Sequence, residues 1–513
     1  MTSSPQTQST ATAVDPSPGG AAKLHRGLGV GSIVFMVVAA AAPLAVVTAS
    51  VPIIISVSGS TAAPQYFLVA TIILGLFSVG FTSMGKYVPN AGAFYSYIQR
   101  GLGRHVGVGA AALALGSYGV MLVGLYAYLG VATAKLLTAV HIGAPWWTCA
   151  IGWVLIVGFL GYRDIELSSK VLGVLLVAET LAVVIANVGI IGHGGHGGFS
   201  PVPFSPSAFA TGAPSLGLMF AFFCFIGFEA TAVFRNEAKD PDRTIPRATY
   251  IAVLFIGVFY AIAAWAVVQG LGIDDAVEAA SREPESVVQD LAVTYVSPIL
   301  TDVIQVLLVT SFFACVLSFH NVITRYQFTL AAKGLLPKAI AEVDDKHRTP
   351  SRSSLAFTVI SLTAMAAVTV FGWDPINQTY LWFSGASTLG LIALMAMTSL
   401  AVIVFFRTKA CGPSVWHTVI APGLAFIGLT VILVLVIGNF ALLVGSTTNA
   451  IVLGGIIVGM FALGLAVAER VRRAHPDRYR ALAQAGRCHS LEATVQVRRV
   501  ARGGAEAVDA GGA

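Results

Sequence analysis

The chain has 513 residues, of which 56% are apolar and only 11% are charged. Soluble globular proteins carry about 25% charged residues because their surfaces face water, so the composition excludes a soluble multidomain protein and indicates a surface that faces mostly lipid. The formal net charge of +6 does not indicate nucleic-acid binding, because the basic residues lie in short loops between long apolar runs.

Residues 1–24 are rich in Ser, Thr, Pro and Ala, and we expect a disordered cytosolic tail because this segment cannot bury enough apolar surface to fold. Residues 25–470 form the expected transmembrane domain, and residues 471–513 form a basic cytosolic tail. A helix needs roughly 20 apolar residues to cross the bilayer, which predicts an all-α integral membrane protein with about 12 transmembrane helices. The predicted spans are 28–50, 64–84, 106–140, 146–161, 171–192, 212–234, 248–271, 298–332, 353–372, 379–406, 415–437 and 449–469.

The distribution of Lys and Arg between alternate loops predicts the orientation. One set of loops holds almost all of these residues, whereas the other set holds only Lys135 and Arg282. Because cytoplasmic loops are enriched in Lys and Arg, both termini are predicted to be cytosolic, and the number of spans is predicted to be even. We expect the protein to lie in the plasma membrane.

This orientation can be tested by labelling single cysteines from outside intact cells. A cysteine at Glu285 should react with an impermeant thiol reagent, whereas a cysteine at Lys239 should react only after the cells are opened, because the loop charges place these positions on opposite sides. Labelling of position 239 in intact cells would show that the predicted span count is wrong.

The first span contains Ala40-Ala41-Ala42-Pro43. Pro43 lacks an N–H group and clashes with the carbonyl four residues before it, which predicts a break in the helix. Lipid cannot satisfy the freed backbone groups, so a break at this depth must face protein or a water-filled cavity. A simple kink is the alternative.

The sixth span contains Phe225-Ile226-Gly227-Phe228-Glu229. Gly227 permits a non-helical backbone, and Glu229 is an ionisable group inside the membrane, which is costly and marks a candidate functional site. A lone glycine can instead mark a close helix contact.

The two predicted breaks are more informative as a pair than alone. They lie five spans apart in helices that run in opposite directions, which is the arrangement of an inverted repeat with a binding site at the bilayer midplane. The half-helix after Pro43 begins with free N–H groups, and the half-helix before Ile226 ends with free carbonyls. A substrate with both a carboxylate and an ammonium group would satisfy the two ends, which favours an amino acid over a sugar or an inorganic ion.

Four stretches of the sequence resemble the amino acid–polyamine–organocation permease family. They are residues 88–103, residues 225–229 with 236–248, residues 321–325 with 331–338, and residues 167–170. The resemblance covers roughly residues 25–470. It implies two inverted five-helix repeats (28–192 and 212–406) with broken helices 1 and 6, two extra helices (415–469), and secondary transport of amino acids or related amines by alternating access, without ATP or another cofactor.

The resemblance places the substrate site between spans one, three, six, eight and ten. Tyr118 and Tyr126 on span three and Ser384 on span ten then become candidate lining residues; aromatic packing and hydroxyl groups bonded to their own helix are the alternatives. Family members often have a Gly-Ser-Gly type break in span one where this chain has Ala41-Ala42-Pro43. Polyamines and other amines therefore stay open as substrates.

Lys170, at the start of span five, is the predicted coupling residue, because proton-coupled members of similar fold have a lysine there at the place of a sodium ion. A buried ammonium can release its proton; the alternative is a residue that only marks the cytosolic end of the span. Ser318 and Asn321 could instead supply oxygen ligands to sodium. Glu179, inside span five, is interpreted as a packing residue held by one hydrogen bond.

The expected partners are an amino acid or amine, a proton or sodium ion, and the lipid bilayer, with no nucleic acid. A non-transporting amino acid sensor is an alternative, although no soluble output domain is visible. A membrane enzyme is disfavoured because the sequence lacks a nucleophile elbow or zinc motif. His193 and His196 could ligate a metal, but no carboxylate or thiol lies nearby in sequence, and we expect no metal site.

Overall fold

The computed structural model describes residues 28–88, 93–163, 169–342, 350–408 and 413–481. Within these ranges the protein is helical, and its one β-type contact is an isolated bridge between Leu28 and Ala238. That bridge joins the start of the first span to the end of the sixth, through hydrogen bonds from Leu28 N–H to Glu237 and from Lys239 N–H to Leu28. The prediction of an all-α fold is confirmed.

Eleven of the described helical segments are long and apolar enough to cross a membrane, and α7 (Trp146–Tyr162) is a shorter apolar helix. These segments confirm the prediction of about 12 spans. The first span consists of α1 (Val30–Ala40), α2 (Pro43–Ala45), η1 (Val46–Ser50) and α3 (Val51–Ser58), and the sixth of α10 (Pro214–Phe223) and η3 (Phe228–Asn236). The others are α4 (Ala63–Gly85), α6 (Arg104–Ala139), α8 (Ser169–Gly192), α11 (Pro241–Leu271), α14 (Pro298–Ala332), α15 (Ser351–Val370), η5 (Pro375–Tyr380) with α16 (Leu381–Thr408), η6 (Trp416–Ile420) with α17 (Ala421–Val444), and α18 (Thr447–Ala474).

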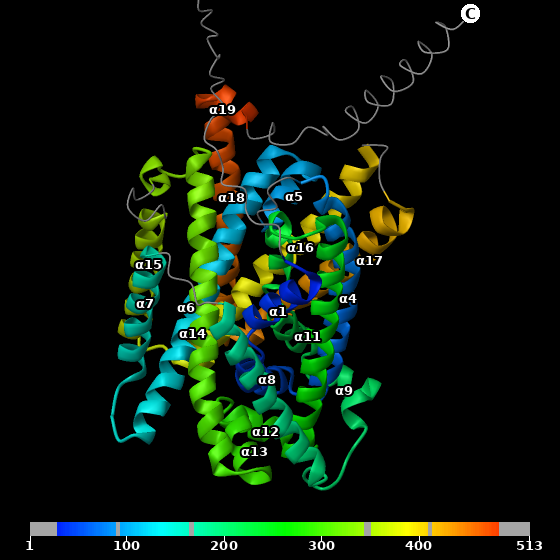
Figure 1. Cartoon of the computed structure of the whole chain (residues 1–513), viewed down its shortest axis with the longest axis vertical. Helices are drawn as coiled ribbons and strands as arrows, with labels where there is room; N and C mark the ends of the chain where they lie inside the picture. The colour runs from blue at the N-terminus through cyan, green and yellow to red at the C-terminus, as the bar shows by residue number, and fades with distance from the viewer. Residues whose placement is uncertain (1–27, 89–92, 164–168, 343–349, 409–412, 482–513) are drawn as a thin grey trace, which may run out of the picture.

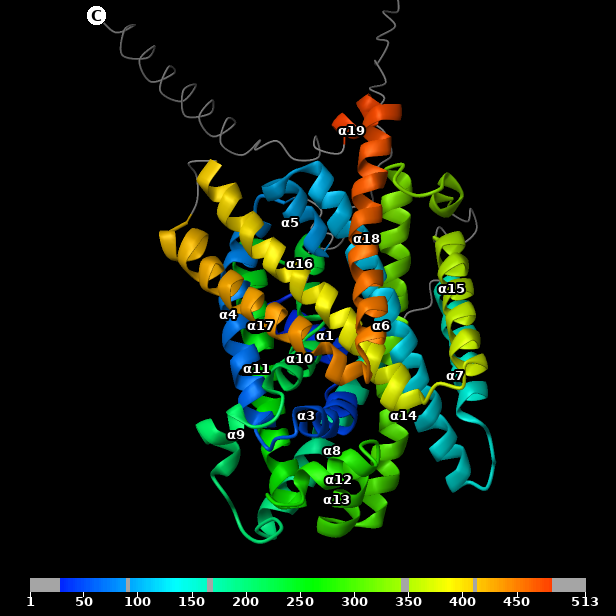
Figure 2. The ribbon, with the colours of Figure 1, turned by 180° about the vertical axis from the view of Figure 1, so that it is seen from behind.

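Short helices cover the two ends of the bundle (Figures 1 and 2). The helices α5 (Ala93–Leu102) and α19 (Pro476–Ala481) lie at one end, called here the α19 end, and α12 (Ala276–Arg282) and α13 (Val287–Tyr295) lie at the other, the α12 end. The remaining short helices are η2 (Val202–Phe204), α9 (Pro206–Ala210) and η4 (Lys338–Ala341). At the α12 end, Lys135 of α6 forms an ion pair with Glu285 at 3.3 Å.

The broken spans lie inside the bundle, and the last span lies outside it. Among the described spans, the sixth has the largest buried share and α18 the smallest. Figures 1 and 2 show α1 in the middle of the bundle, where it packs against α8, α11 and α14, and Figure 2 shows α10, which packs against α4, α16 and α17. Irregular backbone is tolerated at membrane depth only inside protein or beside water, so the central position of these two spans is what permits their interruptions.

Candidate functional site

The first span is interrupted directly before Pro43. Helix α1 ends at Ala40, and Ala42 has φ +48°, a left-handed conformation that is uncommon for residues with a Cβ. The Ala39 carbonyl, which Pro43 cannot pair, accepts a hydrogen bond from Ala42 N–H at 3.2 Å. The Ala41 carbonyl accepts one from the Tyr260 hydroxyl of α11 at 3.1 Å. Protein groups therefore satisfy these two carbonyls of the break.

The sixth span is interrupted at Gly227. Helix α10 ends at Phe223, and Gly227 has φ +110° before the chain resumes as η3. A Cβ at this glycine would have room, because its nearest neighbour, Phe319 Cζ, would be 3.9 Å away. The need for glycine therefore arises from the backbone angle and not from crowding.

Glu229, two residues after the break in the sixth span, joins this span to the third span. Its Oε1 atom accepts a hydrogen bond from the Tyr118 hydroxyl at 2.5 Å, and its Oε2 atom accepts one from Gly227 N–H at 2.9 Å. The residue is buried. With Phe225 and Phe228 it lines a void of about 10 Å³. Glu229 therefore stabilises the break in the sixth span.

A cavity of about 40 Å³ lies between the two breaks. A water molecule needs roughly 10–15 Å³ on the same kind of measure, so the cavity must widen before it can admit an amino acid. Most lining side chains are apolar, and the polar ones include Ser50 and Tyr380, whose hydroxyl oxygens lie 3.1 Å apart. The lining residues are Ala40, Ala41, Ala42, Ala45, Val46, Ser50, Met121, Leu125, Phe223, Cys224, Ile226, Phe312, Cys315, Phe319 and Tyr380.

The predicted substrate residues fall into three groups. Ala40, Ala41, Ala42 and Ile226 line the cavity, and Pro43 begins the helix beside it. The second group, Phe225, Gly227, Phe228, Glu229 and Tyr118, forms the adjoining break in the sixth span and its partner on the third.

Tyr126 and Ser384 form the third group. Both are buried in the described part of the chain without a hydrogen-bond partner for their hydroxyl groups, and neither is among the lining residues.

Several lining residues were absent from the sequence prediction. Met121 and Leu125 lie three and seven residues after Tyr118, and Cys315 and Phe319 lie three and seven after Phe312. These spacings place each set on one helix face. Met121 and Leu125 could have been predicted from Tyr118, because they share its helix face. Phe312 could not, because nothing in the sequence distinguishes it from the other apolar residues of its span.

Glu179 of α8 lies at the start of α2. Its Oε2 atom accepts a hydrogen bond from the Ser311 hydroxyl of α14 at 2.8 Å, and the Leu44 backbone N–H lies close enough to favour the ionised carboxyl group. The side chain is 4% exposed. The Ser311 bond is thus the side-chain hydrogen bond of Glu179, and its carboxyl group lies beside the N-terminus of the continuous helical segment 43–58.

The other predicted coupling residues lie elsewhere or outside the description. Lys170 is in the first turn of α8, but its side chain lies outside the described part of the chain. Ser318 and Asn321 flank the cavity-lining Phe319 on α14, are partly buried, and do not line the cavity themselves. Within the described residues, no group of three or more His, Cys, Asp or Glu side chains could hold a metal ion.

Comparisons with known proteins agree on one class. A family model described as amino acid permease matches residues 32–475. A branched-chain amino acid permease of Bacillus subtilis (strain 168) is 25% identical over 282 residues, which are 53% of this chain and 56% of that protein. A branched-chain amino acid permease of Lactococcus lactis is 26% identical over 55% of this chain and 63% of that protein. This chain thus matches less than two thirds of either protein's length. A probable GABA permease of Pseudomonas aeruginosa is 23% identical over 67% of this chain and 73% of that protein.

Proposed function

Because the chain belongs to the amino acid permease family, a family of transporters and not of enzymes, we propose that it is a secondary active transporter for amino acids with apolar side chains. The observation that carries this proposal is the apolar cavity between two interrupted helices. The backbone there offers polar groups to an amino acid's charged ends, while rings and aliphatic groups surround its side chain. Two relatives named for branched-chain amino acids support the same substrate class.

Each of the two helix ends would bind one charged group of the substrate. The N-terminus of segment 43–58 carries the positive end of the helix dipole and would hold the carboxylate, while the C-terminal carbonyls of α10 would hold the ammonium. The side chain would then contact residues such as Met121, Phe223 and Phe319. The small cavity is that of a closed state in an alternating-access cycle.

Loop charge supports an orientation in the plasma membrane with both termini in the cytosol. The α12 end carries the acidic cluster Asp274, Asp275, Glu278, Glu283, Glu285 and Asp290. Most Lys and Arg residues belong to loops of the α19 end, which is the pattern of a cytosolic face.

We further propose that transport is coupled to protons through Glu179. Ionised Glu179 occupies the helix end at Leu44 that the substrate carboxylate would use, and two negative charges at one site repel each other. A proton on Glu179 removes this repulsion, so substrate and proton bind together and leave together. Nearby titratable groups are Tyr260 of α11 and Cys315 of α14, both of residue types that are ordinarily neutral at pH 7. Lys170 stays the alternative coupling residue.

Counterflow into proteoliposomes tests the transport function. Vesicles loaded with unlabelled leucine should accumulate labelled leucine, isoleucine or valine, because only a transporter exchanges substrate across the membrane. Labelled arginine and putrescine serve as controls for cationic substrates, labelled GABA for an ω-amino acid, and protein-free vesicles for leakage.

Three outcomes would contradict the proposal. If leucine raises the melting temperature of the protein but no counterflow is measured, the protein binds leucine without transporting it, as a sensor would. Counterflow of putrescine or GABA alone would show that the substrate class is wrong. An absence of both leucine binding and counterflow would leave the apolar cavity without its proposed substrate.

A further inference from the structure

A second and larger cavity, which shares no lining residue with the transport site, lies among α6, α14, α15, α16 and α18. It has a volume of about 450 Å³ and is open beside α18, the most exposed of the described spans. Small residues on one face of α6 create the space, among them Ala112, Gly116 and Gly119. A Cβ at Gly116 would collide with Met460 of α18, whereas a Cβ at Gly119 would meet only Phe357, at 3.6 Å.

The lining of this cavity excludes water as its occupant. Gln327 is the only polar residue that lines it among the described residues, and its Oε1 atom already accepts a hydrogen bond from Ser353 at 3.0 Å. A buried water needs two to four polar partners, whereas an apolar cavity of roughly 150 Å³ binds benzene. A cavity three times that volume, in a protein surrounded by lipid, suits an acyl chain.

Basic side chains surround the cavity where it approaches the α19 end. Val108 and Val467 line it there, one helical turn from Arg104 and little more than one turn from Arg472. Leu335 and Leu336 also line it, directly after Gly334, which lies against the Arg478 side chain.

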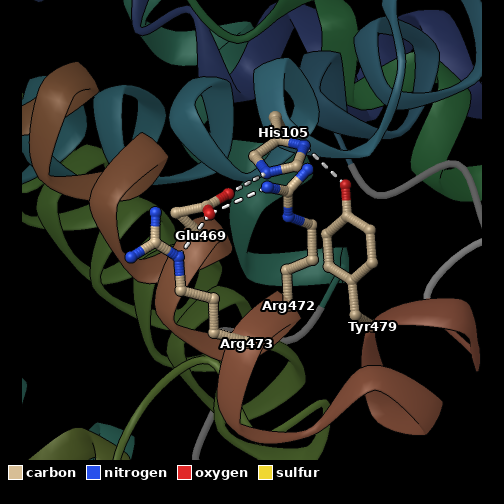
Figure 3. A network of polar contacts seen from close by, with 5 residues as sticks. All are labelled: His105, Glu469, Arg472, Arg473 and Tyr479. Atoms are coloured by element: carbon tan, nitrogen blue, oxygen red, sulfur yellow. Dashed lines mark hydrogen bonds and ion pairs between the residues drawn. The ribbon is translucent and has the colours of Figure 1, made fainter.

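Figure 3 shows how this basic group is organised between α6 and the α18–α19 junction. Glu469 accepts hydrogen bonds from Arg472 at 2.9 Å and Arg473 at 2.7 Å, and lies 3.0 Å from His105. The His105 ring is 2.6 Å from the Tyr479 hydroxyl.

Positive charge exceeds negative charge in this group. Arg104 lies over the Tyr479 ring, with its guanidinium carbon 5.3 Å from the ring centroid. Among the residues drawn in Figure 3, Glu469 is the one carboxylate beside two arginines, and Asp477 of α19 pairs with Arg480. The Arg472 and Arg473 side chains are 55% and 79% exposed, so a further anion can reach them. Arginine forms strong charge-assisted hydrogen bonds with phosphate.

We propose that this site binds one anionic phospholipid, with an acyl chain in the cavity and the phosphate against Arg104, Arg472 and Arg478. The arginines lie about one helical turn from the apolar cavity, so the phosphate and the acyl chain of one phospholipid could reach both. A bound lipid fills the space that α6 and the peripheral α18 enclose with α14, α15 and α16, and it stabilises the folded protein by mass action. Basic pockets between transmembrane helices favour anionic head groups in the same way.

Melting temperatures of the delipidated protein in detergent test the proposal. Phosphatidylglycerol should raise the melting temperature by several degrees, and phosphatidylcholine with the same chains should raise it less. Gly119→Leu, which fills the cavity, should abolish the response to phosphatidylglycerol. Gly152→Leu in α7, where a Cβ meets nothing within 4 Å, is the matched control and should respond as the wild type does.

Two further variants separate the tail from the head group. Ala364→Leu fills the same cavity from α15 and replaces Gly119→Leu if that variant does not fold. The double variant Arg472→Gln, Arg478→Gln should lose the preference for phosphatidylglycerol but keep the weaker response to phosphatidylcholine. An unchanged response in both cavity-filling variants, or equal responses of the wild type to the two lipids, would overturn the proposal. The proposal would also be overturned if the wild type is a dimer and Gly119→Leu is a monomer, because the cavity would then be an interface between two copies of the chain.

Discussion

Gly227→Val should weaken substrate binding at least about tenfold while the protein still inserts into the membrane. The native φ of +110° is unfavourable for any residue with a Cβ, and most of all for a β-branched one. Such a conformation costs of the order of 1–3 kcal/mol, and each 1.4 kcal/mol is about a tenfold change in an equilibrium constant. The variant should therefore leave the interrupted conformation and remove the carbonyls that face the substrate ammonium. Binding of labelled leucine to purified protein measures the loss.

Two companion variants show whether the backbone is responsible. Gly227→Ala should lose almost as much binding as Gly227→Val, because the space around the glycine is open and only the angle is restrictive. Gly75→Val on α4 adds the same side chain to a helical glycine with nothing within 4 Å, and it should bind normally. Near-normal binding by Gly227→Ala would show that the backbone argument is wrong.

Glu179→Gln should abolish the response of uptake to an imposed pH gradient. In the wild type, an acidic exterior protonates Glu179, frees the helix end at Leu44 and promotes substrate binding, so uptake should rise as external pH falls. Glutamine resembles the protonated carboxyl group at every pH, and uptake should then follow the substrate gradient alone. Exchange of labelled for unlabelled leucine should survive because it needs no net proton movement. Uptake into proteoliposomes with external pH lowered at constant internal pH measures both.

The alternative coupling mechanisms predict different results in the same vesicles. If Lys170 carries the proton, Lys170→Ala abolishes the pH response and Glu179→Gln retains it. If the wild type ignores the pH gradient but requires external sodium, proton coupling is wrong, and Ser318 and Asn321 become the ligands to test. If Glu179 carries the proton, as proposed, uptake by Lys170→Ala should respond to pH as uptake by the wild type does.

The positions of the breaks were predictable because their causes are local. Pro43 lacks a donor wherever it is placed, and Gly227 lacks a Cβ. The surroundings of the breaks were not predictable in the same way. Tyr118 donates a hydrogen bond to Glu229 across 111 residues, and the Tyr260 hydroxyl satisfies the Ala41 carbonyl across 219. Spacing within one helix indicates a shared face, but not which helix that face meets.

The sequence by itself determined that this is a bundle of about 12 membrane spans, because the cost of exposing backbone and charge to lipid forces long apolar helices. It also determined which two spans are interrupted. Only the tertiary structure decided that Glu179 lies beside Ser311 and the start of α2, that Ser384 does not line the cavity, and that α6 and α18 enclose an apolar space with α14, α15 and α16. The physical reason is that these features depend on the rotation and depth of each helix against its neighbours. Those are set by the packing of many side chains at once, and no single stretch of the chain encodes them.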